Sequence, residues 1–445
     1  MNQSVRSRVE RAERCTSVAQ AKAWLEGYRA ALSFEESPIE FADSDQWYWV
    51  EDKVALAHRG GKFYSIVGFS KDRESRPMID QPEVGTQGFV VCEFDGELQI
   101  LAQARTEPGN LHVVELGPTI QATWSNYSRA HAGRKTLFLD LFHERNRGGV
   151  TVLADVVLPE LGSFFFRKYN RNIIISVPSP GGFASERFRW IPLSTMIELF
   201  QHDHVINNDA RLVFGLLIKT MLGPQRPVRS SVRNALLDVL QRRQELWKDD
   251  VVRTPLNRLT RWRIGDAEIA PLNDAGYKVI QLRVRASDRE VFEWDQPMIQ
   301  TLDTGLVLLL IRRADDGYQI CLEFKSELGN EKGVLLGPSL SLHNVAHLER
   351  HAAIAAVCAD RAAHCLASHH CSEEGGRFYR SVNEYRIVDV SNVDVGAMNQ
   401  TLGDSHTWVD LDVAIDLYDA IHVLSDDCRG VLSVLFANIE LPGRS

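Results

Sequence analysis

Side chains that can hydrogen-bond a polar ligand are concentrated in one stretch of the sequence, residues 80–127. Gln, Arg, Glu, Asn, Thr and Tyr flank strand-like apolar runs there, and Pro108-Gly109 predicts a turn between two of these runs. We therefore expect this stretch to bind a polar ligand. Its candidate ligand-binding residues are Gln103, Arg105, Asn110, Gln121, Thr123 and Asn126.

Candidates for proton transfer and for anion binding lie in this stretch and after it. The residues whose types suit a general acid or base are Glu160, Tyr127 and His131. The segment FFFRKYNRN adds the cations Arg167, Lys168 and Arg171. Guanidinium groups suit bidentate phosphate contacts, although alternating charges of this kind are also typical of a solvated strand face.

The same motifs recur in the second half of the chain. DQPMIQTLDTG, CLEFKSELGN and VLLGPSLS keep the order of the first stretch, with Gly329 and Pro338 in the places of Gly109 and Pro118. FFFRKYNRN likewise pairs with RFYRSVNEY. A repeat of nearly half the chain predicts two homologous domains and not a solenoid, whose repeats are about 20 to 50 residues long.

The elements that must position these residues are those of an α+β fold, in which each half has a mixed sheet with helices packed against it. Amphipathic helices at residues 18–32 and 232–247 precede the two halves, and Asp95-Gly96 and Asp316-Gly317 predict hairpin turns. A Pro-rich linker at residues 223–230 predicts domains of residues 1–223 and 224–445.

Two shorter helices are expected at residues 195–200 and 209–221. Thr195 and Glu198 have the spacing of a capping box for the first, and Asp209 can cap the second. Trp47 and Trp262 open the two halves at matching positions. Each could stack on a nucleobase, but a core position is the more common role of such a tryptophan.

Composition argues against a nucleic-acid-binding, membrane or secreted protein. The net charge of −9 argues against a nucleic-acid-binding platform, and 44% hydrophobic with 24% charged residues is typical of a globular protein. The N-terminus lacks an apolar signal core, and no run approaches the roughly 18 apolar residues of a membrane span. Seven cysteines without CxxC spacing predict reduced thiols in a cytoplasmic protein, with no zinc site and no disulfide.

The motifs QARTEPGN, ELGPTIQATWSNYSRAHAG, FFFRKYNRN and SEEGGRFY together resemble the NDP-hexose 2,3-dehydratases of deoxysugar and antibiotic biosynthesis. The resemblance covers nearly the whole chain and includes the duplication. It implies a dTDP-4-keto-6-deoxyhexose substrate, which loses the C2 hydroxyl and the C3 proton to give a 3,4-diketo-2,6-dideoxy sugar. It also implies two Nudix-like domains, a homodimer, and functional coupling to a 3-ketoreductase.

That reaction is a β-elimination: a base takes the C3 proton, an acid assists departure of the C2 hydroxyl, and fixed donors stabilise the enolate-like oxygen at C4. The catalytic candidates are then Glu160, Tyr127, His131 and Lys168. Arg105, Arg167 and Arg171 are candidates for binding the diphosphate or the enolate. The second half adds the substrate-binding candidates Glu373, Arg377 and Tyr379.

No cofactor is expected, because the ketone already serves as the electron sink. The chain also lacks a GxGxxG after a strand and a GxxxxGKS/T motif. The helical carboxylate signature with which Nudix hydrolases hold Mg²⁺ is missing as well, which argues against pyrophosphate hydrolysis and a metal site.

The sequence departs from the family pattern in both halves. In the first half, Leu158 and Leu161 stand where polar amides are typical; in the second, Glu323-Phe324-Lys325 replaces the QAR-type triplet. We infer that the first domain holds the better site and that the second is mainly structural or contributes a few residues. A non-catalytic sugar-nucleotide binder that acts as a partner of a pathway enzyme is the alternative function.

Glu160 is the one carboxylate kept in the apolar segment VVLPELGS. If Leu158 and Leu161 surround it, desolvation should raise its pKa and suit it to donate a proton. A surface glutamate at a turn before Gly162 is the alternative.

Overall fold

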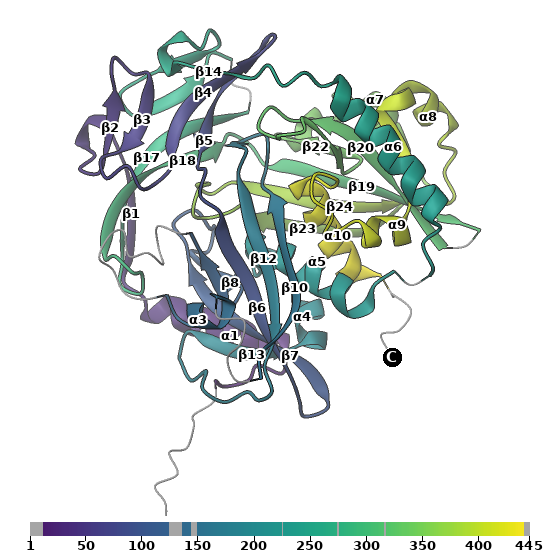
Figure 1. The fold of residues 1–445 in the computed structure, drawn as a ribbon, viewed down its shortest axis with the longest axis horizontal. Helices are drawn as coiled ribbons and strands as arrows, with labels where there is room; N and C mark the ends of the chain where they lie inside the picture. The colour runs from purple at the N-terminus through teal and green to yellow at the C-terminus, as the bar shows by residue number, and fades with distance from the viewer. Residues whose placement is uncertain are drawn as a thin grey trace, which may run out of the picture.

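The computed structural model describes residues 12–123, 136–143, 149–224, 226–273, 276–315 and 317–439. It is a mixed α+β structure of two halves, each with a large mixed sheet, and two smaller sheets at one end (Figure 1). Within the described residues, no helix is both long and apolar enough to cross a membrane.

The large sheet of the first half has seven strands. Its order is β10 (Thr151–Pro159), β12 (Tyr169–Ser176), β6 (Gly85–Phe94), β7 (Glu97–Thr106) and β13 (Phe188–Pro192), with β8 (Val114–Gly117) on β7 and β9 (Ile120–Ala122) on β6. Strands β12 and β6 are parallel and the other pairs antiparallel. The helices of this half are α1 (Val18–Ala31), α3 (Leu139–His143), α4 (Leu193–Leu199) and α5 (Asn208–Leu222).

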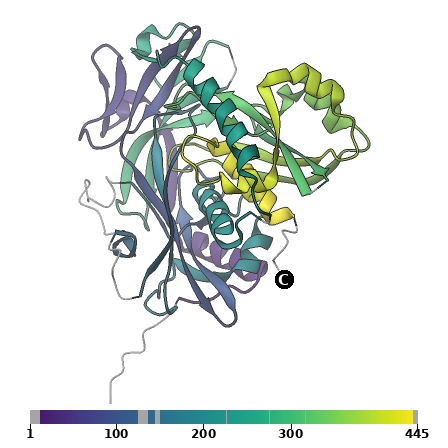
Figure 2. The ribbon, with the colours of Figure 1, turned by 45° about the vertical axis from the view of Figure 1, so that its right-hand side comes forward.

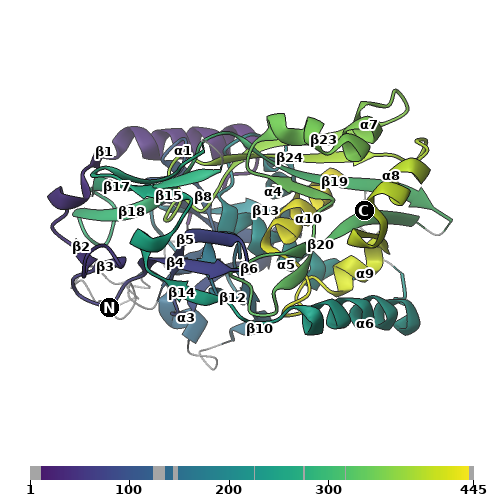
Figure 3. The ribbon, with the colours of Figure 1, turned by 90° about the horizontal axis from the view of Figure 1, so that it is seen from above.

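The large sheet of the second half repeats this topology, again with one parallel pair. Its order is β21 (Val334–Gly337), β20 (Gly317–Ser326), β19 (Gly305–Ala314), β24 (Val382–Asp389) and β23 (His364–Ser372), with β22 (Leu340–Leu342) on β19 and β25 (His406–Asp410) on β20. Its helices are α6 (Ser230–Leu246), α7 (Ala352–Ala359), α8 (Gly396–Leu402), α9 (Leu411–Asp416) and α10 (Asp426–Asn438). Seen from above, α1 and α6 run along opposite sides of the molecule (Figure 3).

The two smaller sheets exchange strands between the halves. One consists of β11 (Phe165–Phe166), β5 (Glu74–Asp80), β4 (Ser65–Lys71), β3 (Ala55–His58) and β2 (Trp47–Val50), and β14 (Val252–Thr254) of the second half joins it on β4. The other consists of β17 (Tyr277–Ala286), β16 (Glu268–Pro271), β15 (Trp262–Ile264) and β18 (Glu293–Thr301), and β1 (Phe34–Ile39) of the first half pairs antiparallel with its β17. The exchange is therefore reciprocal.

Helices α5 and α10 lie side by side at the centre of the molecule (Figures 1 and 2). Their apolar side chains belong to one hydrophobic core that contains residues of both halves. The Tyr418 hydroxyl donates to the Leu212 carbonyl (3.0 Å), and a Cβ at Gly215 would lie 2.1 Å from that hydroxyl. The absence of a side chain at Gly215 thus allows the halves to approach closely.

Two backbone crossings also join the halves. The Gly109 N–H donates to the Gly375 carbonyl (2.8 Å), and the Arg380 N–H donates to the Gly109 carbonyl (2.8 Å). The corresponding crossing joins Gly329 to Gly162 (2.7 Å) and Arg167 to Gly329 (2.8 Å). The turns at Pro108-Gly109 and Leu328-Gly329 therefore each hydrogen-bond to the backbone of the other half.

The structure confirms the predicted entry helices and the first hairpin, in which Asp95 and Gly96 both have positive φ (55° and 79°). The cap predictions were wrong. The N-cap of α5 is Asn207, whose side chain accepts from the Ala210 N–H, and Asp209 lies in the first turn. Helix α4 follows β13 directly at Pro192, without a side-chain cap, so Thr195 is inside the helix.

Candidate active site

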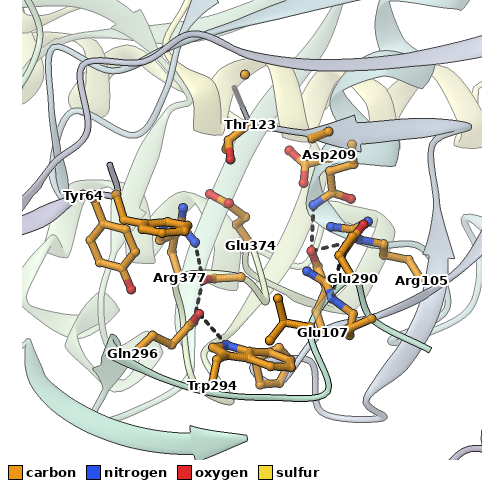
Figure 4. Close-up of a pocket in the computed structure, with 18 of the residues that line it drawn as sticks. Tyr64, Arg105, Glu107, Thr123, Asp209, Glu290, Trp294, Gln296, Glu374 and Arg377 are labelled. Atoms are coloured by element: carbon orange, nitrogen blue, oxygen red, sulfur yellow. Dashed lines mark hydrogen bonds and ion pairs between the residues drawn. The ribbon is translucent and has the colours of Figure 1, made fainter. Parts of the chain in front are cut away.

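A cavity of about 300 Å³ lies where the two halves and the two smaller sheets meet, and both halves line it (Figure 4). The first half contributes the end of β7, β9 and the start of α5. The second half contributes the β17–β18 hairpin and the turn that follows β23. Arginines, carboxyl groups and aromatic rings all face this space.

The first-half wall is a chain of buried polar contacts. Arg105, near the end of β7, places its Nε 3.3 Å from Glu107 Oε1, and both side chains are nearly inaccessible to solvent. Gln121 on β9 donates to the same oxygen (2.8 Å) and accepts from Asn207 Nδ2 (3.0 Å). The other oxygen of Glu107 has no hydrogen-bond partner among the described residues.

The second-half wall is the turn that carries Glu374 and Arg377. Arg377 donates to Gln81 Oε1 from Nε (3.1 Å) and Nη2 (3.0 Å), and its guanidinium lies 4.2 Å from the centre of the Tyr64 ring. The crossing at Gly109 ties this turn to the loop that carries Glu107. The backbone contact therefore keeps Glu107 and Glu374 close to each other, although they are far apart in the sequence.

Aromatic residues also line the cavity. Trp47 Nε1 donates to the Asp295 carbonyl (2.8 Å), which joins β2 to β18. Trp294 Nε1 donates to Gln296 Oε1 (3.0 Å), and Gln296 Nε2 donates to the Gly376 carbonyl (2.9 Å). Trp47 is both a core residue and a cavity-lining residue, so its predicted core position is confirmed.

Burial and neighbouring charges set the protonation of the acidic residues here. Burial first, and then the Glu374 and Glu107 carboxyls, raise the pKa of Asp209 well above its usual value. Burial also raises the pKa of Glu374, against the opposing charge of Arg377. Glu290 differs: burial would raise its pKa, but the charges of Arg289 and Arg105 outweigh burial and lower the pKa to about 2.

A second cavity of about 310 Å³ adjoins the first and shares Arg105, Gln121 and Arg289 with it. Gln103 and Arg187 line it as well. Burial and the charges of Arg105 and Arg187 lower the pKa of Arg289. Three guanidinium groups are thus crowded together, which favours binding of an anion between them.

In the second half, the residues at the corresponding positions make different contacts. Lys325, in the place of Arg105, pairs with Glu327 (2.9 Å) and Asp427 (2.7 Å). Phe164 stands in the place of Arg377, and its ring centre lies 5.3 Å from that of His343. The inference that the second half is mainly structural stays a prediction.

The structure brings some of the predicted site residues together. Those that line the first or second cavity are Gln103, Arg105, Gln121, Thr123 and Arg377. Asn110 and Glu373 are buried behind its walls: Asn110 lies beside Gly375, and Glu373 accepts from Asn383 Nδ2. Asn126, Tyr127 and His131 lie outside the described residues.

Glu160 and Lys168 lie behind the cavity wall. Glu160 is 5% exposed, which excludes a surface position, and burial first, then Asp426, raises its pKa to about 8, the predicted direction. Its Oε1 accepts from Asn170 Nδ2 (2.6 Å), and it is Asn170 that faces the cavity. Lys168 Nζ donates to the Glu83 carbonyl (2.5 Å).

Three other predicted residues point elsewhere. Arg167 donates to both carboxylate oxygens of Asp249 (2.6 and 2.8 Å), and Arg171 pairs with Asp155 (2.6 Å). Tyr379 packs against the apolar cluster of β17 and β18. The charged residues of the segment RKYNRN therefore make structural contacts, and Asn170 is the residue of this segment that lines the cavity.

Sequence reasoning missed several lining residues, namely Tyr64, Glu107, Asp209, Arg289, Trp294 and Glu374. Glu107 and Glu374 were within the motifs TEPGN and SEEGG, so motif position was a usable signal. Arg289 and Trp294 belong to a hairpin of the second half that reaches the first-half site only through the strand exchange, which no local pattern reveals.

Comparisons with known proteins identify the family of this chain. The family model of NDP-hexose 2,3-dehydratase matches residues 18–217 and again 233–435. The chain is 30% identical over 444 residues to dTDP-4-dehydro-6-deoxy-alpha-D-glucopyranose 2,3-dehydratase of Saccharopolyspora spinosa, covering 93% of this chain and 90% of that protein. It is 34% identical to the protein of that name from Amycolatopsis orientalis (83% and 80% covered), and 31% identical to that from Streptomyces violaceoruber (89% and 92%). The chain belongs to the NDP-hexose 2,3-dehydratase family.

Proposed function

We propose that this protein eliminates water across C2 and C3 of a dTDP-4-keto-6-deoxyhexose, giving a 3,4-diketo-2,6-dideoxy sugar. The observation that carries the proposal is the cavity of about 300 Å³ in which both halves bring together arginines, carboxyl groups and aromatic rings. The three relatives named above are dehydratases of one such sugar nucleotide, and they match most of the chain.

The parts of the cavity suit the parts of this substrate. The rings of Trp47, Tyr64 and Trp294 offer apolar faces for the thymine base. Arg105 and Arg289 offer guanidinium groups for the diphosphate. The sugar then lies on the carboxyl side, where Gln121 and Thr123 also reach.

The reaction needs only proton transfers and charge stabilisation. Breaking the C3–H bond leaves an enolate whose negative charge resides on the C4 oxygen, and an arginine at the cavity wall stabilises it. Departure of the C2 hydroxyl as water then forms the C2=C3 bond. Glu160 and Lys168 are proposed to act through Asn170 and the cavity wall, as positioning residues.

The proposal includes further features that remain predictions. These are a Nudix-like fold of each half, a division at residues 223 and 224, a homodimer, a cytoplasmic location, a role in antibiotic biosynthesis, and coupling to a 3-ketoreductase. All seven cysteines are free thiols, which supports the reducing compartment.

Incubation with dTDP-4-keto-6-deoxyglucose and a 3-ketoreductase tests the proposal. We expect a 2-deoxy sugar nucleotide, detected by mass spectrometry, and no such product without this protein. The reductase is included because a free 3,4-diketo sugar decomposes. Tight binding of the substrate without product would contradict dehydration and support the alternative, a non-catalytic sugar-nucleotide binder.

A further inference from the structure

Three carboxyl groups share the sugar side of the cavity, and their neighbours differ. This inference rests on the proposed function and concerns which carboxyl moves which proton. Glu107 is the most constrained, because its Oε1 accepts from both Arg105 (3.3 Å) and Gln121 (2.8 Å). Two donors on one oxygen fix the orientation of this carboxyl and leave it less free to turn toward a substrate.

Asp209 has the opposite environment. It is 3% exposed in the first turn of α5, and no hydrogen bond or ion pair joins its side chain to another described residue. Its principal charged neighbours are Glu374, Glu107 and Glu160, and of these nearby charges only Arg105 is a cation. Burial and like charges together disfavour the charged form of this carboxyl and raise its pKa.

The second half contains a natural comparison. Asp427 occupies the same place at the start of α10, where it accepts from Lys325 Nζ (2.7 Å) and Ser341 Oγ (2.7 Å). Burial would raise the pKa of Asp427, but Lys325, Ser341 and His343 together outweigh burial, and the pKa is lowered. In the first half, Arg105 stands in the place of Lys325 and pairs with Glu107 but not with Asp209.

Glu374 lies between these extremes. Burial, with the Glu107 carboxyl, raises the pKa of Glu374, but the cations Arg377, Lys168 and Arg105 oppose the shift. Its carboxyl and that of Asp209 turn into the same open space, below Thr123 in the view of Figure 4. Three cations favour the charged form of Glu374, whereas Asp209 has no paired cation among the described residues, so Glu374 is the better proton acceptor and Asp209 the better proton donor.

We propose that Glu374 is the base that removes the C3 proton and that Asp209 is the acid that protonates the departing C2 hydroxyl. The C3–H bond breaks as the proton moves to the Glu374 carboxylate, and its electron pair forms the enolate at C4. The C2–O bond then breaks as Asp209 gives its proton to the oxygen, and water leaves. The enol at C3 becomes the ketone when Glu374 returns its proton to C2 and the Asp209 carboxylate takes the O3 proton. Both residues regain their starting states.

The two proton transfers can be measured separately in D₂O. Coupled turnover reports the whole elimination, and NMR of the 4-keto sugar reports deuterium entering at C3, which needs the base alone. We expect Asp209→Asn to cut turnover by roughly 10² to 10⁴ while C3 exchange continues. Glu374→Gln should lose both.

A matched control is Glu115→Gln. Glu115 is likewise a fully buried carboxyl with a raised pKa, but it accepts from Ser372 Oγ (2.7 Å) outside the cavity. This variant should keep both activities. Binding of the substrate, measured by calorimetry, should stay within a few fold of wild type in all three variants.

Turnover by Asp209→Asn within a few fold of wild type would overturn the acid assignment, and so would loss of C3 exchange in that variant. C3 exchange retained by Glu374→Gln would overturn the base assignment. Asn is isosteric with the neutral carboxyl, so the variant should fold; if its thermal midpoint shows otherwise, Asp209→Ser must give the same separation of activities. Absence of product from the wild-type protein would refute the proposed function itself, which keeps the two failures distinct.

Discussion

Several carboxyl groups of this chain are buried where their charged form is disfavoured, and not all of them face the cavity. Glu115 on β8 is completely inaccessible to solvent, and burial raises its pKa to about 8, although Ser372 and Arg211 oppose the shift. Glu373 has the same raised value, with burial again the main cause. A raised pKa therefore does not identify a catalytic residue here; it must coincide with access to the cavity, as it does for Asp209 and Glu374.

Glu115→Gln makes a prediction about stability and pH. Above its ordinary pKa of 4.5, the unfolded chain releases the Glu115 proton, whereas the folded chain keeps it up to about pH 8. The contribution to the free energy of unfolding is therefore fully present below pH 4.5 and is lost as the pH rises to 8. Relative to wild type, the variant should gain up to about 1.4 kcal/mol per pH unit in that window.

Urea unfolding of both proteins at several pH values from 4.5 to 8 measures this gain. A stability difference that does not change with pH would show that Glu115 is already ionised in the folded protein.

At the scale of elements, the backbone crossings at Gly109 and Gly329 have equivalent geometry, but only the crossing at Gly109 holds residues of the cavity. A Cβ at Gly109 would lie 1.5 Å from the Phe378 carbonyl oxygen, and a Cβ at Gly329 would lie 1.9 Å from that of Phe165. The first crossing holds the turn with Glu374 and Arg377 against the cavity. The crossing at Gly329 holds the turn of Gly162, which corresponds to the turn of Gly375.

Alanine at either glycine should destabilise the protein, by about 1 to 3 kcal/mol, because backbone must move to admit the methyl group. Gly109→Ala should in addition weaken substrate binding at least tenfold, since Arg377 moves with its turn. Gly329→Ala is the matched control and should bind nearly as wild type. Calorimetry at a temperature where both variants are folded decides this, and equal losses of affinity would contradict the difference between the crossings.

The sequence was sufficient for elements and motifs that are local in the chain. Amphipathic spacing predicted α1 and α6, and the DG dipeptide predicted the hairpin of β6 and β7. Polar motifs also predicted Arg105, Gln121 and Arg377 as parts of the cavity wall. These successes depend on residues close in sequence or on the repeat between the halves.

The remaining parts of the site depend on long-range contacts. Asp209 was interpreted as a cap because it starts a helical pattern, but Asn207 takes that role and frees Asp209 to face the cavity. Trp294 reaches the site only because the β17–β18 sheet packs beside the first half. Glu160 sits one residue behind the wall, with Asn170 between, and sequence alone cannot distinguish the two positions.

At the scale of the whole molecule, the halves share a core. Helices α5 and α10 pack together, and apolar residues of both large sheets belong to the same cluster. Chains of this length usually unfold domain by domain. With a common core and reciprocal strand exchange, neither half keeps its interior when the other unfolds.

We therefore predict a single unfolding transition that coincides by tryptophan fluorescence and circular dichroism. Gly215→Ala should lower its midpoint without splitting it, because the new methyl would meet Tyr418 and Ser433 of the other half (2.1 and 2.2 Å). Gly27→Ala in α1 has open space around it and should be neutral or stabilising by up to about 1 kcal/mol. Two separate transitions in either probe would contradict the shared core.

The reciprocal exchange of β1 and β14 gives the molecule the geometry of a swapped dimer whose two subunits happen to be one polypeptide. The connection between α5 and α6 then acts by raising the effective concentration of each half near the other, because each half completes a sheet of its partner. A chain cut at that connection would still carry every strand needed for both halves. Because of the covalent link, each half pairs with the other half of its own molecule in preference to a half of another molecule. The link therefore determines which two halves line one cavity.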